Sequence, residues 1–448
     1  MTIFELISSA KLSICLTVAG AIIASIASIS ALLMAQKTFS FLRDVSPREV
    51  EEAVKKAGCI SRMKKTKNLT LLGNRQQALA HREKRFGCKK SVFANMRCSQ
   101  KAPLPETALA PIISILKPLK GLDSELALNL EYFLNLEGVS YEVLIGIADR
   151  ADPAVSLVED FLAKHPEAPM RLIIVGAPGN LQPKMASLAG LEAEARGKIF
   201  LVSDGNTRPH PKSLLPIVAV FEDAAVGVAS APFFVRQPES LGARLRGLRI
   251  GTLILTSICG VYCLTKVPVV VGKWMAVRKE AIADLGGFAV LGEVMCADGL
   301  IAAKLRELGW QGAIIPDLID VYLGEWNFQQ AYAQQLRWSR HIRFVEPLEP
   351  VAELFWNGTF LLLIGAVFWV LGSNLGGIFV GVAAFFVWGI YAVVYLRFGG
   401  CWRDLLLLPL QDLMMLPITF WCYLGNEVVW RGQRFRVGKG GVLEEVVK

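Results

Sequence analysis

Charged residues, histidines and paired cysteines are scarce in this sequence of 448 residues. Only 19% of the residues are charged, against about 25% in soluble domains, and 53% are hydrophobic, which excludes a wholly soluble or disordered chain. The four histidines lie far apart, and the nine cysteines include no pair with zinc-ribbon spacing, which argues against a structural zinc site. No P-loop and no GxGxxG segment follows an expected strand, so a bound nucleotide would have to be held by acids, cations and a metal.

The first long apolar run predicts a membrane anchor. From Leu12 to Gln36, 25 positions carry no charge, which exceeds the roughly 20 residues that a helix needs to cross a bilayer. A cleaved signal peptide is the alternative, because the run ends in Ala and Ser. However, the segment from Lys37 to Lys101 carries 17 Lys and Arg against five acids, and such flanks stay in the cytoplasm. We therefore expect an uncleaved anchor whose carboxyl side is cytosolic.

A second apolar region predicts two membrane helices near the carboxyl terminus. Residues 354–396 are uncharged over 43 positions, interrupted by a Gly-rich turn at 372–377. The next apolar stretch, 405–426, contains Asp412 and two prolines, which are costly at mid-membrane. We favour a re-entrant or interfacial segment there over a full crossing, because the basic tail after it should be cytosolic. Residues 250–265 are uncharged but short for a span, so an interfacial or buried helix is expected.

The segment 45–101 is strongly basic and contains few aromatic residues. A nucleic-acid partner would need platforms on which bases stack, and only Phe86 and Phe93 are present. We therefore expect no nucleic acid. Anionic lipid headgroups are the favoured partner, at about 1 kcal/mol per cation near the membrane surface.

Residues 105–345 alternate short β-branched runs with helical patterns. This alternation predicts an α/β domain with a mostly parallel sheet and helices on both faces. Ligands of such sheets bind at the carboxyl ends of the strands. The expected strands are 112–119, 141–147, 171–175, 198–203 and 226–231, and the expected helices are 123–135, 153–165, 183–196 and 211–222.

Acidic residues stand directly after two of these strands. Asp149 follows the strand at 141–147, and Asp204 follows the strand at 198–203. Each could form a turn or cap a helix, as Asp often does before Pro or Gly. The alternative is that an acid at a strand tip holds a hard divalent cation, which would neutralise a diphosphate leaving group.

Two more candidates lie downstream. Asp298 precedes an expected helix at 300–308, and it is either a helix cap or a general base facing a nucleophile. An amphipathic helix at 326–343 carries Gln334, Arg337 and Trp338. Arg337 could grip phosphate and Trp338 could stack on a base or acceptor, although Arg and Trp before a membrane can also be interfacial anchors.

These segments occur in a distinctive order along the chain: Lys117-Pro-Leu-Lys-Gly-Leu-Asp123, Asp149, Pro183-Lys184, Asp204 with Arg208, Asp298, and Gln334-x-x-Arg337-Trp338. The order resembles the ceramide glucosyltransferase family, which includes bacterial hopanoid-associated glycosyltransferases. The similarity covers about residues 110–345 and the segment 430–435. It implies a glycosyltransferase-A fold and transfer, with inversion, of a glucose- or N-acetylglucosamine-type sugar from a UDP-sugar to a lipid hydroxyl, as in ceramide or a hopanoid.

The resemblance also implies roles for individual residues. Asp298 would be the catalytic base, and Asp204 would lie beside the donor diphosphate and bind Mg²⁺ or Mn²⁺. Related processive synthases carry a second acid two residues after the position of Asp204, where this chain has Asn206. The other candidates would bind the donor or the acceptor: Asp149, Lys184, Gln334, Arg337 and Trp338.

The whole sequence predicts a multi-pass protein of the bacterial inner membrane with a cytoplasmic catalytic domain. Two other functions stay open: a processive polysaccharide synthase, which shares the Gln-x-x-Arg-Trp signature but usually has more spans, and a non-catalytic membrane scaffold whose basic segment recruits anionic partners. The expected regions are an anchor (1–44), a basic linker (45–104), a glycosyltransferase-A domain (105–345), a membrane region (346–430) and a basic cytosolic tail (431–448).

Overall fold

The computed structural model describes residues 3–42, 112–122, 125–178, 181–292, 294, 297–430, 433–438 and 443–445. The basic segment 45–101 lies outside these residues, so its contact with lipid headgroups stays a prediction. The expected region boundaries also stay predictions.

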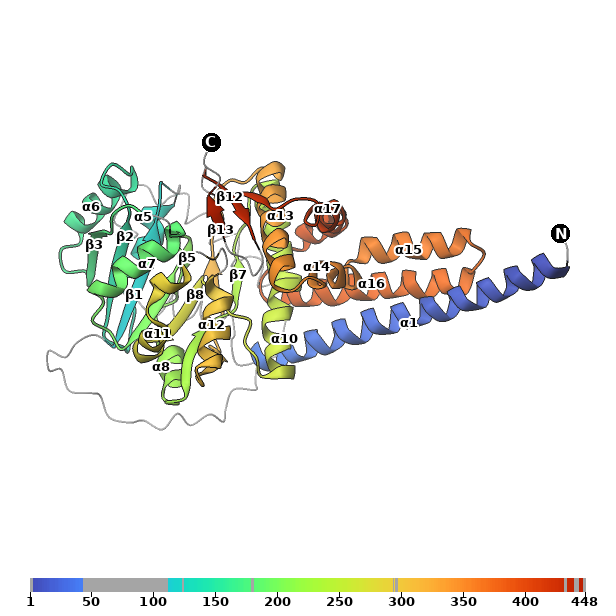
Figure 1. Ribbon diagram of the computed structural model, residues 1–448, viewed down its shortest axis with the longest axis horizontal. Coiled ribbons are helices and arrows are strands. Elements are labelled where there is room, and N and C mark those ends of the chain that lie inside the picture. The colour runs from blue at the N-terminus through green and yellow to red at the C-terminus, as the bar shows by residue number, and fades with distance from the viewer. Residues whose placement is uncertain are drawn as a thin grey trace, which may run out of the picture. The chain divides into compact units, whose positions relative to one another are not determined.

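A seven-stranded sheet forms the centre of the domain that follows the first helix (Figure 1). Its order is β3-β2-β1-β4-β8-β6-β9; β8 runs antiparallel to both neighbours, and the other pairs are parallel. The parallel strands at its centre are buried almost without interruption, as strands covered on both faces should be. The strands are β1 (Ile113–Leu119), β2 (Tyr141–Ile147), β3 (Met170–Ile174), β4 (Ile199–Ser203), β6 (Val226–Ser230), β8 (Trp274–Arg278) and β9 (Gln311–Ile314).

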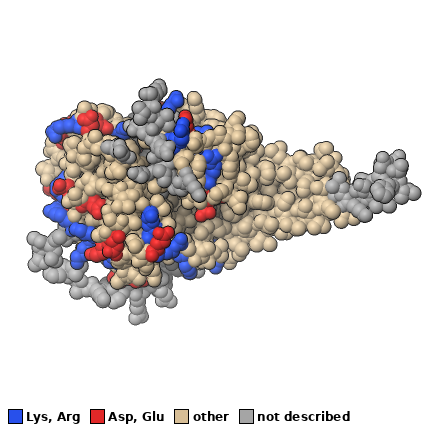
Figure 2. Space-filling view, viewed as in Figure 1, with Lys and Arg blue, Asp and Glu red and all other residues tan. Residues whose placement is uncertain are grey.

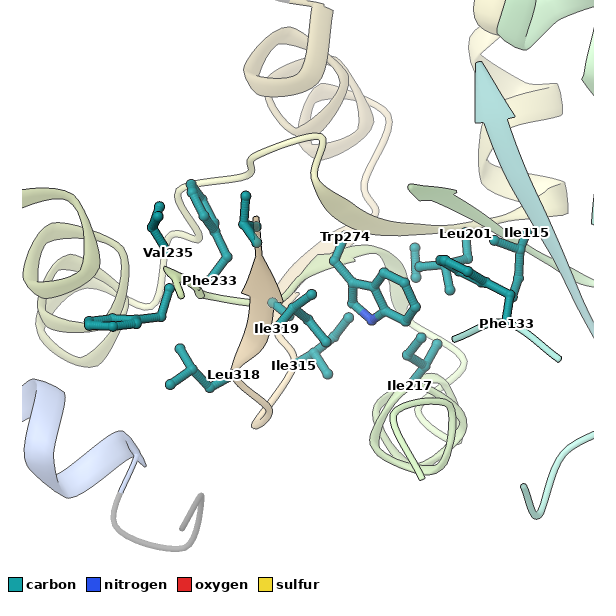
Figure 3. Packing of buried hydrophobic residues seen from close by; sticks show 14 of the residues in the cluster. Ile115, Phe133, Leu201, Ile217, Phe233, Val235, Trp274, Ile315, Leu318 and Ile319 are labelled. Carbon is teal, nitrogen blue, oxygen red and sulfur yellow. The ribbon is translucent and has the colours of Figure 1, made fainter. Parts of the chain in front are cut away.

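Helices cover both faces of this sheet. One core contains buried residues of α5 (Leu126–Glu131), α6 (Ala154–Lys164) and α8 (Leu215–Phe221), and Figure 3 shows Trp274 of β8 within it, near Phe133 and Ile217. The other core contains buried residues of α7 (Pro183–Glu194), α11 (Lys279–Leu285), the short η2 (Phe288–Leu291) and α12 (Ala297–Glu307). The sheet is therefore sandwiched between two apolar layers, and its strand ends are left to carry polar groups.

The expected fold class, an α/β domain with a mostly parallel sheet accompanied by apolar helices, is confirmed. Each of the five expected strands is present within a residue of its expected ends. The expected helix at 123–135 is shorter, because α5 ends at Glu131. The sequence analysis missed β8, because the mostly apolar segment that contains it lacks the alternation of apolar and polar residues that marks a strand. Its antiparallel direction also cannot be predicted from such a segment.

A small second sheet and a long helical segment extend this domain. The sheet pairs β10 (Ile319–Val321) with β5 (Thr207–Arg208) and β7 (Phe233–Val235). The helical segment consists of α9 (Leu241–Arg249), the π-helical turn η1 (Ile250–Ile254) and α10 (Leu255–Thr265). It begins well before the expected 250–265, so it is long enough to cross a membrane, unlike the short interfacial or buried helix that the sequence predicts; 67% of its most apolar window is buried.

The helix α13 (Phe328–Val345) packs against α9. Its start is defined by a capping box: the Asn327 side chain accepts from the Gln330 backbone N–H, and the Gln330 side chain accepts from the Asn327 backbone N–H. This local signal determines the register of the helix. It therefore determines which face carries Gln334, Arg337 and Trp338.

Three apolar helices, α1 (Ile3–Leu42), α15 (Gly358–Val370) and α16 (Asn374–Arg397), lie side by side and form the helix bundle (Figure 1). α1 and α16 approach closely at two glycines, because a Cβ on Gly20 would lie 2.8 Å from the Gly376 carbonyl oxygen. Such small-residue contacts are typical of helix packing in membranes. On the face shown in Figure 2, the described part of the bundle carries no Lys, Arg, Asp or Glu. Large apolar side chains of the bundle, such as Ile22 of α1 and Phe385 of α16, are exposed.

Four helical segments of the described chain are long and apolar enough to cross a membrane, or five if a bent pair forms one span. Two helices, α15 and α16, occupy the region 354–396, where the sequence predicts two membrane helices; α16 is long enough to span a membrane, and α15 reaches that length only as part of the bent pair. α15 joins the bent pair with the preceding α14 (Glu349–Ala352) and η3 (Glu353–Trp356), at an angle of 75°. The four single segments are Ser13–Thr38, Leu241–Thr265, Asn374–Arg397 and Trp402–Trp421.

The last apolar stretch forms η4 (Trp402–Leu407) and α17 (Leu408–Trp421). Asp412, the acid that is costly at this depth, is buried but fully engaged: its Oδ2 accepts from Trp388 Nε1 at 2.8 Å and from the Thr359 backbone N–H at 3.2 Å. It therefore accepts a hydrogen bond from the first turn of α15, where the backbone N–H groups have no partner within the helix. A small antiparallel sheet follows, made of β11 (Glu427–Trp430), β12 (Gln433–Val437) and β13 (Leu443–Glu445).

Candidate active site

Asp204 directly follows β4, at the carboxyl edge of the parallel strands. Lys184 Nζ, from the first turn of α7, lies 3.2 Å from its Oδ1, and Lys273 Nζ, from the residue before β8, lies 2.7 Å from its Oδ2. Burial alone would raise the pKa of Asp204, but the two ammonium groups outweigh burial and hold that pKa well below its ordinary value. The strand-tip acid expected from the sequence is therefore an ionised carboxylate between two lysines.

Lys117 of β1 lies beneath this group and is fully buried. Its Nζ donates to Ser203 Oγ at 3.2 Å and to the Asp204 carbonyl oxygen at 3.0 Å, and it lies 3.9 Å from the centre of the Phe133 ring. Burial lowers the pKa of Lys117 to about 7, against the opposing effect of Asp204. Lys117 thus fixes the backbone at the tip of β4 rather than the carboxylate itself.

Asp298 lies in the first turn of α12 and reaches the same place from the other side. Its Oδ2 accepts from the Gly272 backbone N–H at 3.0 Å, and its Oδ1 lies 3.8 Å from Lys184 Nζ. Lys184 therefore contacts both Asp204 and Asp298. A Cβ at position 272 would lie 2.3 Å from Asp298 Oδ2, so the close approach of this carboxylate requires a glycine there.

The helices α9 and α13 form the other side of the candidate site, here called the helix wall. The guanidinium carbon of Arg246 on α9 lies 4.4 Å from the ring centre of Trp326 and 5.2 Å from that of Trp338. The charges of Arg337 and Asp204 both act on Arg246, which places this wall beside the acid–lysine cluster. Gln334 lies one turn before Trp338 on α13 and is partly exposed.

Asp149 occupies the expected edge of the sheet but has a different local role. It is exposed, follows β2, and accepts from the Ala151 backbone N–H at 2.9 Å, which is a turn-forming contact. Its neighbour Asp152 accepts from the Gly121 N–H at 2.9 Å and so joins the loops after β1 and β2. Among the residues that the structure describes, no hydrogen bond or ion pair connects Asp149 to Asp204, which lies two strands away along the sheet edge.

The sequence analysis missed Lys273 and Arg246. Lys273 donates to both Asp204 Oδ2 and Asn206 Oδ1, the latter at 3.1 Å, although it is only 9% exposed. A single lysine inside the apolar segment 267–277 was the available signal, because a lysine is rarely buried unless it is paired. Arg246 gave no signal, since its two tryptophan partners lie some 80 and more residues further along the chain.

The donor set at Asp204 is a poor match for a divalent cation. Over the described parts of the chain, no group of three or more His, Cys, Asp or Glu side chains could hold a metal ion. Both oxygens of the one strand-tip carboxylate already face ammonium groups, and the amide oxygen of Asn206 faces one of them. Mg²⁺ and related ions prefer several oxygen ligands with no competing cation.

Cations and carboxylates converging at the carboxyl edge of an α/β sheet, next to apolar helices, are suited to an enzyme that handles a phosphorylated donor near a membrane. Residues 79–443 match the profile of glycosyl transferase family 21. The chain therefore belongs to glycosyl transferase family 21, and the glycosyltransferase class expected from the sequence is confirmed.

Individual relatives agree with this family. Ceramide glucosyltransferase 1 of Caenorhabditis elegans is 25% identical over 46% of this chain and 44% of its own length. Ceramide glucosyltransferase 3 of the same organism is 22% identical over 75% of each chain. The expected resemblance to ceramide glucosyltransferases is thus confirmed, although the matched region spans less than half of the first relative.

Solved structures are similar at a lower level. A mannosyltransferase from Pyrobaculum calidifontis, in complex with GDP-Man and Mn²⁺, is 17% identical with a TM-score of 0.40, over 72% of this chain and 86% of its own. Glucosyl-3-phosphoglycerate synthase from Mycobacterium tuberculosis, in complex with Mn²⁺ and UDP, is 15% identical with a TM-score of 0.32, over 50% and 74%.

Proposed function

We propose that this glycosyltransferase moves a hexose, of the glucose or N-acetylglucosamine type, from a UDP-sugar to the hydroxyl of a membrane lipid such as ceramide or a hopanoid, with inversion at the anomeric carbon. The observation that carries the proposal is the contact of Lys184 with both Asp204 and Asp298. One cation thereby links the strand-tip acid to an acid from a helix 94 positions further along the chain. The names of the ceramide glucosyltransferase relatives support the choice of donor and acceptor.

Asp298 is the proposed general base. Its carboxylate takes the proton of the lipid hydroxyl while the hydroxyl oxygen forms a bond to the anomeric carbon. The bond from that carbon to the diphosphate oxygen breaks on the opposite face, and UDP leaves with the electron pair. The Gly272 N–H holds one oxygen of Asp298, so the other oxygen faces the reacting atoms and Lys184.

The remaining candidates are proposed to bind the substrates. Asp204 and Lys184 lie on the diphosphate side, Asp149 on the uridine side, and Gln334, Arg337 and Trp338 of α13 contact the diphosphate and the acceptor. The resemblance implied Mg²⁺ or Mn²⁺ at Asp204. Because lysine ammonium groups already contact both oxygens of this carboxylate, Asp204 does not fit the role of a metal ligand, and the proposed reaction involves no ion there.

The acceptor is proposed to arrive from the bilayer along the apolar helices. A polar pocket lies between these helices, and its lining includes Arg249, Glu353 and Gln411. Arg249 is one turn from Arg246 on α9, and its Nη2 donates to Glu353 Oε2 at 2.6 Å. Among the described residues, Gln411 Nε2 and Arg249 Nε are buried without a hydrogen-bond partner. This pocket supports entry of the polar end of a lipid beside α9 and α13, since the two unpaired N–H groups in it need a hydrogen-bond acceptor.

The proposed topology has three crossings, made by α1, α15 and α16, with the catalytic domain and the tail in the cytoplasm of a bacterial cell. Two contacts support an interfacial position for 405–426. Before this stretch, Arg236 donates to the Phe398 carbonyl oxygen, and at its carboxyl end Arg343 of α13 donates to the Gly425 carbonyl oxygen at 3.1 Å. The catalytic domain thus holds both ends of the stretch, as in a segment that returns to the same side.

A transfer assay in detergent tests the proposal. The purified protein is incubated with UDP-glucose or UDP-N-acetylglucosamine and with ceramide, a hopanoid polyol or diacylglycerol, and products are identified by mass spectrometry and by the anomeric coupling in NMR spectra. We expect a lipid monoglycoside of inverted configuration. A long polymer would identify a processive synthase, and neither transfer nor donor hydrolysis with any pair would refute the proposal.

A further inference from the structure

The strongest unassigned feature is the ammonium group of Lys273, which lies against the carboxylate at the tip of β4. Its Nζ lies 2.7 Å from Asp204 Oδ2 and 3.1 Å from Asn206 Oδ1. Lys184 Nζ lies 3.2 Å from the second oxygen of Asp204. The carboxylate and the amide that follow β4 are thus ligands of lysine ammonium groups.

The backbone around Lys273 is firmly held on both sides. The Gly272 N–H donates to Asp298 Oδ2, and its carbonyl oxygen accepts from Lys184 Nζ at 3.2 Å. Trp274 is fully buried, with its ring centre 6.2 Å from that of Phe133, and Figure 3 shows it deep in the apolar core. The consecutive residues 272–274 therefore connect the proposed base Asp298, the carboxylate of Asp204 and the apolar core.

An ammonium group can make three hydrogen bonds, and Lys273 uses two of them on Asp204 and Asn206. The third can reach an oxygen of a bound diphosphate. Two positive charges at one carboxylate also repel a divalent cation from it, and the second oxygen that Lys273 contacts belongs to a neutral amide.

We propose that Lys273, together with Lys184, supplies the positive charge that holds the donor diphosphate, and that UDP binding therefore needs no divalent metal. This inference rests on the proposed function in taking UDP as the nucleotide. Asp204 then acts as the counter-ion that positions the two lysines, not as a metal ligand. The Lys273 ammonium group would also stabilise the charge that grows on UDP as it leaves.

The test measures UDP binding to the full chain in detergent by calorimetry, in EDTA and in Mn²⁺. We expect the dissociation constants of the unaltered protein in the two conditions to agree within about threefold. Lys273→Met should weaken binding in EDTA about tenfold or more, because a charge-assisted hydrogen bond is lost. Lys273→Arg should recover most of the affinity. Lys198→Met, an exposed lysine before the amino end of β4, is the matched control and should bind as the unaltered protein does.

Each outcome decides between the alternatives. UDP binding that appears only with Mn²⁺ overturns the inference and leaves the proposed function standing. Absence of UDP binding in both conditions, by protein with an unchanged melting temperature, overturns the proposed function itself. Asp204→Asn gives a second measurement: UDP binding in EDTA should persist, whereas tight Mn²⁺ binding that is lost in this variant, followed by the spectrum of the ion, would identify a metal ligand and refute the inference.

Discussion

The two sides of the proposed active site, which we call the sheet wall and the helix wall, are stabilised by different kinds of contact. On the sheet wall, Lys117, Lys184 and Lys273 meet Asp204 through direct hydrogen bonds of 2.7 to 3.2 Å. On the helix wall, Arg246 lies over two tryptophan rings at 4.4 and 5.2 Å. Hydrogen bonds to charged groups fix the positions of atoms, whereas stacking tolerates sliding. The sheet wall therefore suits the reacting groups, and the helix wall suits a substrate that varies in shape.

The largest effect is expected at the proposed base. Asp298→Asn keeps the size of the side chain but removes the proton acceptor, so the transfer rate should fall about 10²- to 10⁴-fold. UDP affinity, measured by calorimetry, should change less than about threefold. Loss of UDP affinity with turnover preserved would show that Asp298 belongs to donor binding and that the sheet wall does not contain the base.

Gly272→Ala tests whether the transfer rate depends on the position of the Asp298 carboxylate. The new Cβ would lie 2.3 Å from Asp298 Oδ2, so the carboxylate must move by an ångström or more, which should lower the transfer rate about 10²-fold. Gly299→Ala is the matched control, because a Cβ at Gly299 of α12 has no atom of the described residues within 4 Å. Equal rates for the two alanine variants would contradict the proposed geometry.

The helix wall should be less sensitive. Trp338→Leu removes one of the two rings around Arg246, and such cation–π contacts contribute about 0.5–2 kcal/mol. We expect kcat/KM for the acceptor to fall roughly threefold to thirtyfold with little change in UDP affinity. A double-mutant cycle with Arg246→Gln should show a coupling of similar size, and strictly additive effects would mean that the two side chains act independently.

The smallest effect concerns stability and pH. Burial lowers the pKa of Lys117 to about 7, whereas in an unfolded chain this lysine keeps its ordinary pKa of 10.5. Between these two pH values the unfolded state therefore binds more protons than the folded state, so the free energy of unfolding should rise with pH. Below about pH 7, Lys117 should contribute nothing to the pH dependence of the free energy of unfolding. In Lys117→Met this part of the rise should disappear. Chemical denaturation of both proteins at several pH values measures the difference, and identical slopes would refute it.

Much of the fold could be predicted from sequence because it depends on local pattern. The ends of β1, β2 and β4 followed from apolar runs that stop at polar residues, and the bundle followed from long stretches without charge. The candidates Asp204 and Asp298 also followed from their places after a strand or at the start of a helix, whereas Lys184 followed from the family resemblance. Asp149 satisfied the same rule, yet its carboxylate forms a turn, because a strand-tip position does not specify the direction of a side chain.

The sequence by itself determined β1, β2, β3, β4 and β6 and the long apolar helices, since these depend on residues within a turn or two of each other. Only the tertiary structure decided that Lys273 faces Asp204, because β8 enters antiparallel beside β4 and places the residue before it at the end of that strand. In the same way, the docking of α13 on α9 decided that Arg246 meets Trp326 and Trp338. Strand direction and helix docking follow from burial summed over the whole chain, and a local pattern does not contain that sum.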